Sequence, residues 1–424
     1  MSRDQAGGLT TLLLIPSSYG AIAWASWLAL YQARLIPWDP APPLADLLYA
    51  LVLALYAAST TLWYSRYRAW QKRNDAELLQ AMPTRHGVAD PRPYLAFLHA
   101  LGFFGWVLYT RDFATALGGL PTFGKVLLGA SWVIRRQAEV TSSVGTQLSY
   151  FGWIAIALTC FEFRRGQVGR LWLALAVAQF AANFLYIART GPITILFTTA
   201  LLALVAVPST RTRLLGVRVV ALSVVSGIIF LLIATWIGKV AVEGQYRATP
   251  LPLWAQNLYY YGTSGFAYFS HLVDAHEPIA YAPERALYPA LKALSALGVA
   301  APPPSQINEY FSVPFSTNVG TFLEPFYRDG GLVFAFAAIV LQSFGLDLLG
   351  LALLRTGRRL ALFAWANLCF VTFIGFFTPK ITGFPTWLFT GLGIAAVLWK
   401  ANYRAADLGR SIVTPSEGGQ DATY

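Results

Sequence analysis

The chain has little charge, few cysteines and few histidines for its length. Only 12% of its 424 residues are charged, whereas about a quarter are charged in soluble globular proteins, so that class is excluded. The two cysteines, Cys160 and Cys369, lie in apolar runs, which excludes a disulfide framework and a thiolate metal site. The four histidines have no zinc-type spacing, and we expect neither a metal nor a cofactor.

Apolar residues, in contrast, make up 56% of the chain, and the mean hydropathy is +0.52. A helix needs about 20 apolar residues to cross a bilayer, and on this measure the sequence predicts about ten spans. They are expected near residues 10–31, 43–64, 94–110, 144–163, 171–188, 192–207, 218–238, 331–354, 360–378 and 385–400. The predicted fold class is therefore an all-α polytopic membrane protein.

The spans divide the chain into four parts. An N-terminal bundle of about seven spans covers residues 1–238, a large hydrophilic loop covers 239–330, and about three further spans cover 331–404. The polar tail, 405–424, is predicted to be disordered. The first apolar run follows Arg3 without a cleavage pattern of small residues, so we interpret it as a retained span. No internal repeat is evident, which argues against an inverted-repeat transporter.

The 31 Lys and Arg residues are spread through the loops and give the chain a net charge of +11. Most of them fall in short segments that share one side of the membrane with the N-terminus. Because basic residues concentrate in cytoplasmic loops, we expect both termini to be cytoplasmic and the large loop to face outward. This spread is typical of loops beside anionic membrane lipids, and we expect no nucleic-acid partner.

Two outer segments have the spacing of amphipathic helices. The first covers residues 121–137, and the second covers residues 284–299. In the second segment, leucines recur at helical spacing, namely Leu287, Leu291, Leu294 and Leu297. Each segment either lies along the membrane interface or packs as a helix in a folded extracytoplasmic cap.

Arginines at the outer ends of predicted spans are the first candidates for function. Arg189 lies between two apolar segments, where a guanidinium is costly unless it is paired or functional. A guanidinium is also a bidentate donor suited to phosphate oxygens. Thr190 and the following Gly-Pro pair favour a close backbone approach with free amides at a helix start. The other outer arginines in this class are Arg135, Arg136 and Arg247. The alternative for each is a side chain that only extends to the lipid headgroups.

The run from Thr317 to Gly331 is the strongest local signal in the large loop. It combines carboxylates, an amide, hydroxyls and aromatic rings, a mixture that suits a sugar, and its candidates are Asn318, Thr321, Glu324, Tyr327, Arg328 and Asp329. If the run is helical, Asn318, Thr321 and Pro325 share a face. The alternative is a set of ordinary interfacial anchors before a span.

An aromatic stripe lies earlier in the same loop, from Tyr259 to Phe269. Its partial helical spacing favours core packing or an aromatic belt over catalysis, although Tyr260 stays a candidate for a sugar contact. His271, just beyond the stripe, is a candidate general base.

The chain resembles the Wzy-type oligosaccharide repeat-unit polymerases of bacterial surface polysaccharide assembly, which make O-antigen and exopolysaccharide. The resemblance rests on an outer arginine before the fourth span, the Arg189-Thr190-Gly191 turn, the late large loop, and the run from Asn318 to Gly331. The architecture covers most of the chain, whereas the motifs are short and degenerate.

This resemblance implies a glycosyltransferase of the bacterial inner membrane with a GT-C-like fold and a periplasmic large loop. Such an enzyme is expected to transfer a glycan from undecaprenyl pyrophosphate to the sugar of an incoming lipid-linked unit. A polysaccharide chain-length regulator is a candidate partner. Fixed guanidinium groups would stabilise the departing diphosphate electrostatically.

The resemblance also suggests roles for the candidate residues. Arg189 and either Arg135 or Arg136 would hold the diphosphate, and Arg247 would assist. The proton of the attacking hydroxyl would go to Glu324, Asp329 or His271. Asn318 and Tyr327 would orient sugars.

Two other functions stay open. Ligases that join O-antigen to lipid A core use outer arginines together with a histidine in the large loop, and His271 or His276 would fit that pattern. A flippase for lipid-linked oligosaccharides, or another transporter, is the second alternative. The lopsided outer loop argues against a transporter, because alternating access generally uses two comparable halves.

Overall fold

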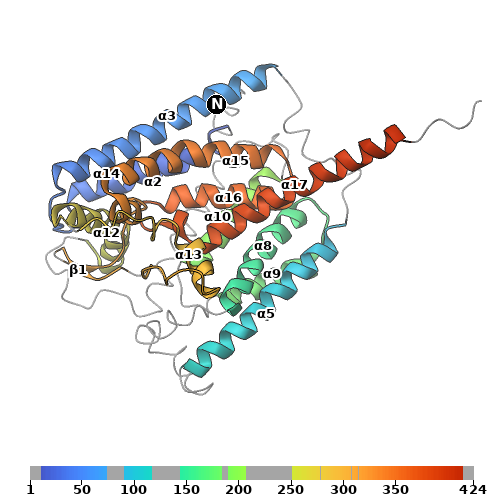
Figure 1. The fold of residues 1–424 in the computed structure, drawn as a ribbon, viewed down its shortest axis with the longest axis horizontal. Coiled ribbons are helices and arrows are strands. Elements are labelled where there is room, and N and C mark those ends of the chain that lie inside the picture. Colours follow the sequence, from blue (N-terminus) through green and yellow to red (C-terminus); the bar gives the residue numbers. More distant parts are fainter. Residues whose placement is uncertain are drawn as a thin grey trace, which may run out of the picture.

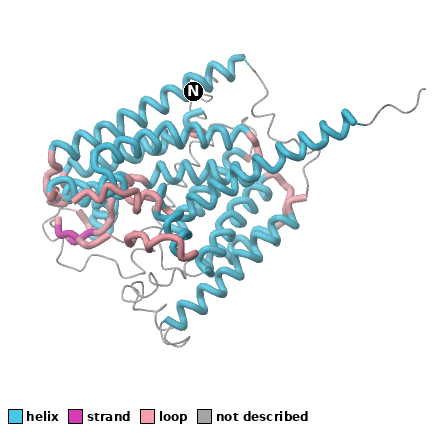
Figure 2. The backbone as a smooth tube through the Cα atoms, in the orientation of Figure 1, coloured by secondary structure: helices cyan, strands magenta, loops and turns pink. Residues whose placement is uncertain are grey.

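The computed structural model describes residues 11–73, 90–116, 144–183, 190–206 and 251–413, apart from the single residues 277, 307 and 314. The predicted span 218–238 and the predicted helix 121–137 lie outside these ranges. Figure 1 shows the described segments as a bundle of long helices, and Figure 2 shows that short loops and one small hairpin gather at one end. We call this end, where residues 253–330 lie, the loop end.

The helices of the first half are α2 (Pro16–Ala33), α3 (Pro43–Arg73), α5 (Arg92–Ala116), α8 (Val144–Arg164), α9 (Arg170–Ala182) and α10 (Thr190–Val205). Those of the second half are α12 (Leu253–Asp274), α13 (Tyr288–Ala296), α14 (Leu323–Val340), α15 (Leu346–Arg355), α16 (Arg359–Ile374) and α17 (Phe384–Val413). The π-helical turn η3 (Leu341–Gly345) joins α14 to α15, and the short turn η4 (Lys380–Thr382) precedes α17. Strands β1 (Phe311–Ser312) and β2 (Ser316–Thr317) pair antiparallel.

The predicted all-helical membrane class is supported at a coarse level. Within the described residues, four helices are long and apolar enough to cross a membrane, namely Pro43–Tyr67, Arg92–Thr115, Val144–Arg164 and Leu323–Arg355. Shorter apolar helices lie at four further predicted spans, namely Arg170–Ala182, Gly191–Val205, Arg359–Ile374 and Phe384–Trp399. Of these, α9, with 13 residues, extends for about 20 Å. Since a hydrocarbon core is about 30 Å thick, the predicted count of ten spans stays a prediction, as does the GT-C-like fold.

Glycines bring α5 and α8 into close contact. A Cβ atom at Gly105 would lie 2.3 Å from the backbone nitrogen of Ser149, and one at Gly102 would lie 2.6 Å from the Cα of Gly152. Small residues allow such close backbone approach between membrane helices. In Figure 1, α5, α8 and α9 accordingly lie together on one side of the bundle.

A buried carboxylate joins three helices deeper in the bundle. Asp347, fully buried in α15, accepts hydrogen bonds from the backbone N–H of Ser17 at 2.7 Å and from its hydroxyl at 2.5 Å. The hydroxyl of Ser59, in α3, donates to the same carboxylate at 2.6 Å. Because Ser17 lies in the first turn of α2, Asp347 also places negative charge at a helix N-terminus, where it is stabilised.

Helix α12 occupies part of the segment that the sequence assigns to a hydrophilic loop. Its aromatic stripe packs inward, as expected for core packing: Phe266 and Phe269 are fully buried. Trp24 of α2 contacts Phe266 edge-on at 5.1 Å and Phe322, beside α14, at 5.5 Å. This aromatic cluster holds α12 against the start of α14, where the candidate site lies.

Candidate functional site

The site forms where α14 begins at the loop end. The backbone N–H of Phe322 donates to the carbonyl of Gly375 at 2.8 Å, which fixes the helix start against the end of α16. The helix then runs from Leu323 and breaks at Gly330 and Gly331, whose backbone angles are not helical. Residues 323–329 therefore form a separate short turn at the loop end, before the long apolar part of the span.

This start corrects one expectation from the sequence. Asn318 and Thr321 precede the helix, so they do not share a helical face with Pro325. Thr317 pairs instead in the hairpin with β1. Thr321 is fully buried, and its hydroxyl accepts a hydrogen bond from the backbone N–H of Leu323 at 3.3 Å. The physical reason is that this hydroxyl satisfies an otherwise unpaired amide at the helix start, so its role is structural.

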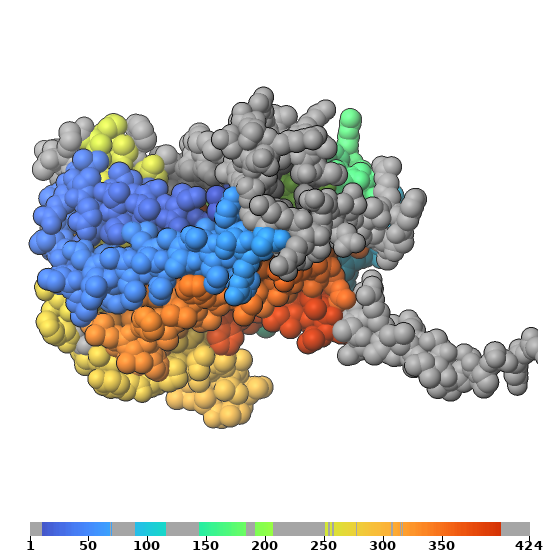
Figure 3. All heavy atoms as spheres, turned by 90° about the horizontal axis from the view of Figure 1, so that it is seen from above, coloured from blue at the N-terminus to red at the C-terminus, as the bar shows by residue number. Residues whose placement is uncertain are grey.

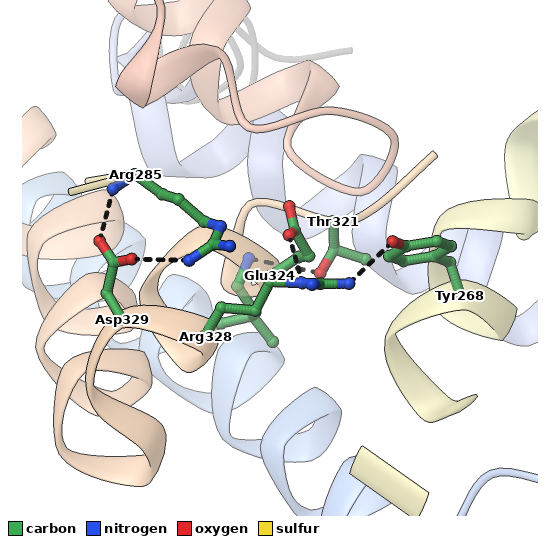
Figure 4. Close-up of polar contacts among 7 residues, drawn as sticks. Tyr268, Arg285, Thr321, Glu324, Arg328 and Asp329 are labelled. Carbon is green, nitrogen blue, oxygen red and sulfur yellow. Dashed lines mark hydrogen bonds and ion pairs between the residues drawn. The ribbon is translucent and has the colours of Figure 1, made fainter. Parts of the chain in front are cut away.

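Arg328 links two elements of the site. Its Nε atom lies 2.9 Å from the carboxylate of Glu324, one turn earlier in α14. Its Nη2 atom donates to the hydroxyl of Tyr268, in α12, at 3.0 Å. Figure 4 shows Glu324, Arg328 and Tyr268 in this order. Asn308 adds a side-chain hydrogen bond to Glu324, so the carboxylate has both a charged and a neutral partner.

An aromatic ring lies beside this chain. Phe311, from β1, stacks on the ring of Tyr268 with centroids 5.0 Å apart. The imidazole of His271 contacts the same Phe311 ring at 4.7 Å. His271 and Tyr268 lie one turn apart on α12, so both reach Phe311 from the same helix face. His271 is partly exposed, whereas the side chain of Glu324 has only 3% of its surface accessible.

Asp329 holds the loop that leads to α13. Its Oδ2 atom accepts hydrogen bonds from the backbone N–H groups of Arg285 and Ala286, both at 2.8 Å. The guanidinium of Arg285 lies 3.4 Å from Oδ1. Figure 4 shows Arg285 and Arg328 on the same side of α14, each directed at a carboxylate. With both oxygens engaged, Asp329 acts as a clamp for this loop, and its use as a general base is disfavoured.

The two ion pairs form what we call the paired-arginine site: Glu324, Arg328, Asp329 and Arg285. The carboxylates are buried, with 3% and 0% of their side-chain surface exposed, whereas the whole side chains of Arg328 and Arg285 retain 17% and 26%. Buried charges are stable only when paired and hydrogen-bonded. Each buried carboxylate is thus paired with an arginine whose side chain is less deeply buried.

Sequence reasoning selected Glu324, Arg328, Asp329 and His271, and the structure brings all four to this end of the bundle. It missed Arg285 as a site residue, because Arg285 lies 44 positions from its partner Asp329 and has no local motif. Tyr268 was noted only as part of the aromatic stripe. A buried tyrosine hydroxyl generally has a hydrogen-bond partner, and that rule is the one signal that could have singled it out.

The other sugar-contact candidates lie nearby with different surroundings. Tyr327 is half-buried and contacts Phe269 edge-on at 5.6 Å, while Asn318 is also half-buried. Tyr260 stacks on Trp38, with centroids 5.4 Å apart. Tyr327 and Asn318 are therefore partly exposed to a sugar, whereas one face of the Tyr260 ring is covered by Trp38.

Tyr259 of α12 fixes the end of α2 and the start of the loop between α2 and α3. Its hydroxyl donates to the carbonyl of Leu30 at 2.5 Å and accepts from the backbone N–H of Leu35 at 3.0 Å. Burial raises the pKa of the Tyr259 phenol above its ordinary value, while the backbone hydrogen bonds act in the opposite direction. The phenol is therefore protonated at neutral pH, as its role as a donor requires.

The arginines of the sequence hypothesis, Arg135, Arg136, Arg189 and Arg247, lie outside the described residues, and Thr190 is described only as the first residue of α10. The described residues on either side of Arg189, Asn183 and Gly191, both lie close to Trp153. Its indole N–H donates to Asn183, at the end of α9, at 2.7 Å. A Cβ atom at Gly191 would lie 3.0 Å from the same indole, so the packing beside Gly191 is tight.

Within the described ranges, no group of three His, Cys, Asp or Glu side chains gathers that could hold a metal ion. The described functional groups of this site at the loop end are the guanidiniums of Arg285 and Arg328, the carboxylates of Glu324 and Asp329, the imidazole of His271 and the phenol of Tyr268. Comparison of the chain with protein-family models, curated proteins and solved structures gave no match.

Proposed function

We propose that this protein is a membrane glycosyltransferase that polymerises oligosaccharide repeat units carried on undecaprenyl pyrophosphate. The proposed location is the periplasmic face of a bacterial inner membrane. The observation that carries the proposal is the chain Glu324–Arg328–Tyr268 at the head of a membrane-spanning helix. The grouping of a guanidinium, a phenol and aromatic rings supports a binding site for a lipid-linked sugar.

The proposed reaction forms one glycosidic bond and breaks one sugar–phosphate bond. A hydroxyl oxygen of the incoming unit attacks the anomeric carbon of the growing glycan, and the lipid diphosphate leaves with the bonding electron pair. The hydroxyl proton passes to a base, and negative charge develops on the diphosphate. Donors placed in advance around that charge stabilise the transition state more than the ground state.

We assign the base to His271 in this scheme. It is partly exposed and lies on Phe311, whereas Glu324 is enclosed and paired with Arg328. A neutral imidazole is a suitable acceptor near pH 7. Glu324 and Asp329 then serve to hold Arg328 and Arg285 in fixed orientations, as second partners that restrict a flexible side chain.

The guanidiniums provide the anion contacts of the proposal. The side chains of Arg328 and Arg285 are partly exposed beside buried carboxylates, which supports a role for both as contacts to diphosphate oxygens. Arg189 with Arg135 or Arg136, and Arg247, are proposed from the sequence to add charge at the same face. A planar guanidinium binds phosphate oxygens in a bidentate manner, which a lysine does not reproduce.

A second candidate function is supported by one observation. The position of His271 beside the paired-arginine site also fits a ligase, in which the glycan is transferred to a different acceptor. The bond that breaks is the same in both cases, and only the acceptor differs. Residues of the site therefore do not separate polymerase from ligase, but the acceptor requirement does.

The test uses the purified full chain in lipid nanodiscs with a synthetic lipid-linked repeat unit as the only substrate. A polymerase converts it into a ladder of longer lipid-linked glycans. A ligase leaves it unchanged until lipid A core is added, and then gives a single-transfer product. A flippase in sealed vesicles moves the lipid across the bilayer without changing its size, and that result would remove the proposal.

A further inference from the structure

Helix α13 exposes large apolar side chains although it lies outside the predicted spans. The exposed fractions are 41% for Leu287, 40% for Leu294, 76% for Leu297 and 70% for Val299. Contiguous apolar surface of this kind on a folded protein generally marks a contact with a partner or a membrane. Leu294 lies in α13, Leu287 and Leu297 cap its two ends, and Val299 follows it; we call these four exposed side chains the α13 patch.

The helix is amphipathic. Leu287, Leu291 and Leu294 are spaced by four and three residues and so lie on one side of α13. Lys292 lies away from this side: its ammonium group donates to the hydroxyl of Tyr288 at 3.1 Å and lies 5.4 Å from the centre of that ring. An apolar side and a separate basic and aromatic side are the features of a helix that lies in a membrane interface.

The patch is at the level where the apolar helix α17 begins. In Figure 1, α13 lies beside the first turn of α17 and not beyond the ends of the bundle. The segment after α13 is fixed to the same level, because Gln306 donates to the carbonyl of Thr382 at 3.1 Å. Figure 3 shows the gold lobe that contains α13 projecting from the flank of the molecule.

The neighbouring surface of α17 has the character of a lipid-facing helix. Trp387, in its first turn, is 39% exposed, and its indole N–H donates to the carbonyl of Ile381 at 3.0 Å. Tryptophan is enriched where a helix crosses the membrane interface. Further along α17, Ile394 and Leu398 are exposed. The α13 patch therefore continues an apolar surface that would face lipid.

We propose that α13 lies in the outer interfacial layer of the bilayer, with Leu287, Leu294, Leu297 and Val299 inserted among phospholipid chains. The occupant of the patch is the phospholipid surface, because the patch adjoins the lipid-facing side of α17 and has a basic side chain suited to anionic headgroups. This inference goes beyond the glycosyl transfer proposed above and does not depend on it. It decides between the two alternatives that the sequence leaves open for residues 284–299.

The position of α13 has a consequence for the site. Asp329 binds the backbone N–H groups of Arg285 and Ala286, which directly precede Leu287. The membrane-seated helix is thus fastened to the paired-arginine site at its N-terminal end. A lipid-linked substrate that moves along the membrane surface would reach Arg285 next to α13.

The test places a nitroxide spin label at single introduced cysteines in the full chain, in a background in which both natural cysteines are replaced, Cys160→Ser and Cys369→Ala. Leu294→Cys and Leu297→Cys report on the patch, and Lys292→Cys on the same helix is the matched control. The protein is placed in nanodiscs of phosphatidylethanolamine and phosphatidylglycerol. The accessibility of each label to oxygen, which partitions into lipid, is compared with its accessibility to a water-soluble nickel complex.

The expected result is preferential contact with oxygen at positions 294 and 297 and preferential contact with the nickel complex at position 292. Preferential contact with the nickel complex at 294 and 297 would overturn the proposal, since the patch would then face water. Low accessibility to both reagents would also overturn it, because protein would then cover the patch. Neither readout depends on enzymatic activity, so failure here is distinct from failure of the proposed function.

Discussion

The carboxylate of Asp329 contacts Arg285 twice, through the backbone N–H at 2.8 Å and through the guanidinium at 3.4 Å. These two residues lie 44 positions apart. Asp329 is the last residue before the break in α14, and Arg285 lies three residues before α13. The contact therefore fixes the loop-end segment to the head of the broken span. It also orients one of the two guanidiniums of the paired-arginine site.

Replacing this carboxylate tests its role as a clamp. Asp329→Asn keeps one oxygen acceptor but places an amide donor opposite the Arg285 guanidinium. Breaking a buried ion pair by changing one partner generally costs about 3–5 kcal/mol, so we expect a clear fall in thermal stability in detergent. The matched control is Glu284→Gln, because Glu284 is exposed. Equal melting temperatures for both variants would contradict the clamp.

Gly331 provides a second stability test. Its φ is +60°, and a Cβ atom there would lie 2.8 Å from the Cδ1 atom of Ile279. Gly331→Ala is expected to destabilise the fold by about 1–3 kcal/mol, the cost of a backbone conformation that only glycine adopts readily. Gly391→Ala is the control, because nothing lies within 4 Å of a Cβ atom at that position. Thermal unfolding of the two variants measures the difference.

The double variant Gly331→Ala with Ile279→Ala separates the two causes. Removing the Ile279 side chain relieves the contact but leaves the backbone conformation unchanged. We expect only partial recovery of stability in the double variant. Full recovery would mean that the contact with Ile279, and not the backbone, requires the glycine.

The link between Arg328 and Tyr268 is expected to affect turnover. Tyr268→Phe removes the hydroxyl that accepts from Arg328 and keeps a ring to stack on Phe311. A hydrogen bond to a charged group contributes about 1.5–3 kcal/mol, so kcat should fall at least about tenfold. Arg328→Lys should impair chain extension as well, since lysine cannot contact both partners in the same geometry.

A double-mutant cycle shows whether these two residues act together. If Arg328 and Tyr268 act as one unit, the loss in the double variant is smaller than the sum of the two single losses. Additive losses would show that the contact between them has no part in turnover. The measurement is the initial rate of ladder formation in nanodiscs.

Arg189 carries the prediction made from the sequence. Arg189→Ala should abolish chain extension while the single repeat unit persists, and Arg189→Lys should also be impaired. If Arg189→Ala still makes normal long polymers, Arg189 has no part in the mechanism.

Trp153→Phe removes the indole N–H that donates to Asn183, and we expect a fall in kcat of about tenfold from this loss of one hydrogen bond. Trp387→Phe, at an exposed tryptophan, is the control.

The membrane helices could be predicted because their signal is local. A run of about 20 apolar residues is readable from the sequence alone, and α3, α5, α8 and the helices from Leu323 to Arg355 lie where such runs were found. Helix α12 could not be separated from the loop in this way. Its side chains, such as Phe266 and Tyr268, are buried by neighbouring helices, and that packing is not visible in the composition of the segment.

The sequence predicted which residue types form the site, but not which residues contact one another across different segments. Glu324 and Arg328 are one helical turn apart, so a contact between them follows from helix geometry. The partners of Asp329 and Arg328 in other segments, Arg285 and Tyr268, depend on tertiary structure. The helix start at Leu323 was also missed, because it depends on the contact between Phe322 and Gly375.

The central claim is that each new glycosidic bond releases one lipid diphosphate. The most direct measurement supplies the purified chain in nanodiscs with a lipid-linked repeat unit and quantifies released undecaprenyl pyrophosphate together with the lengths of the glycans. The account predicts one diphosphate released for every linkage formed, and loss of both in Arg189→Ala. A substrate that keeps its size and releases no diphosphate, even with a range of repeat units and with lipid A core, would contradict it.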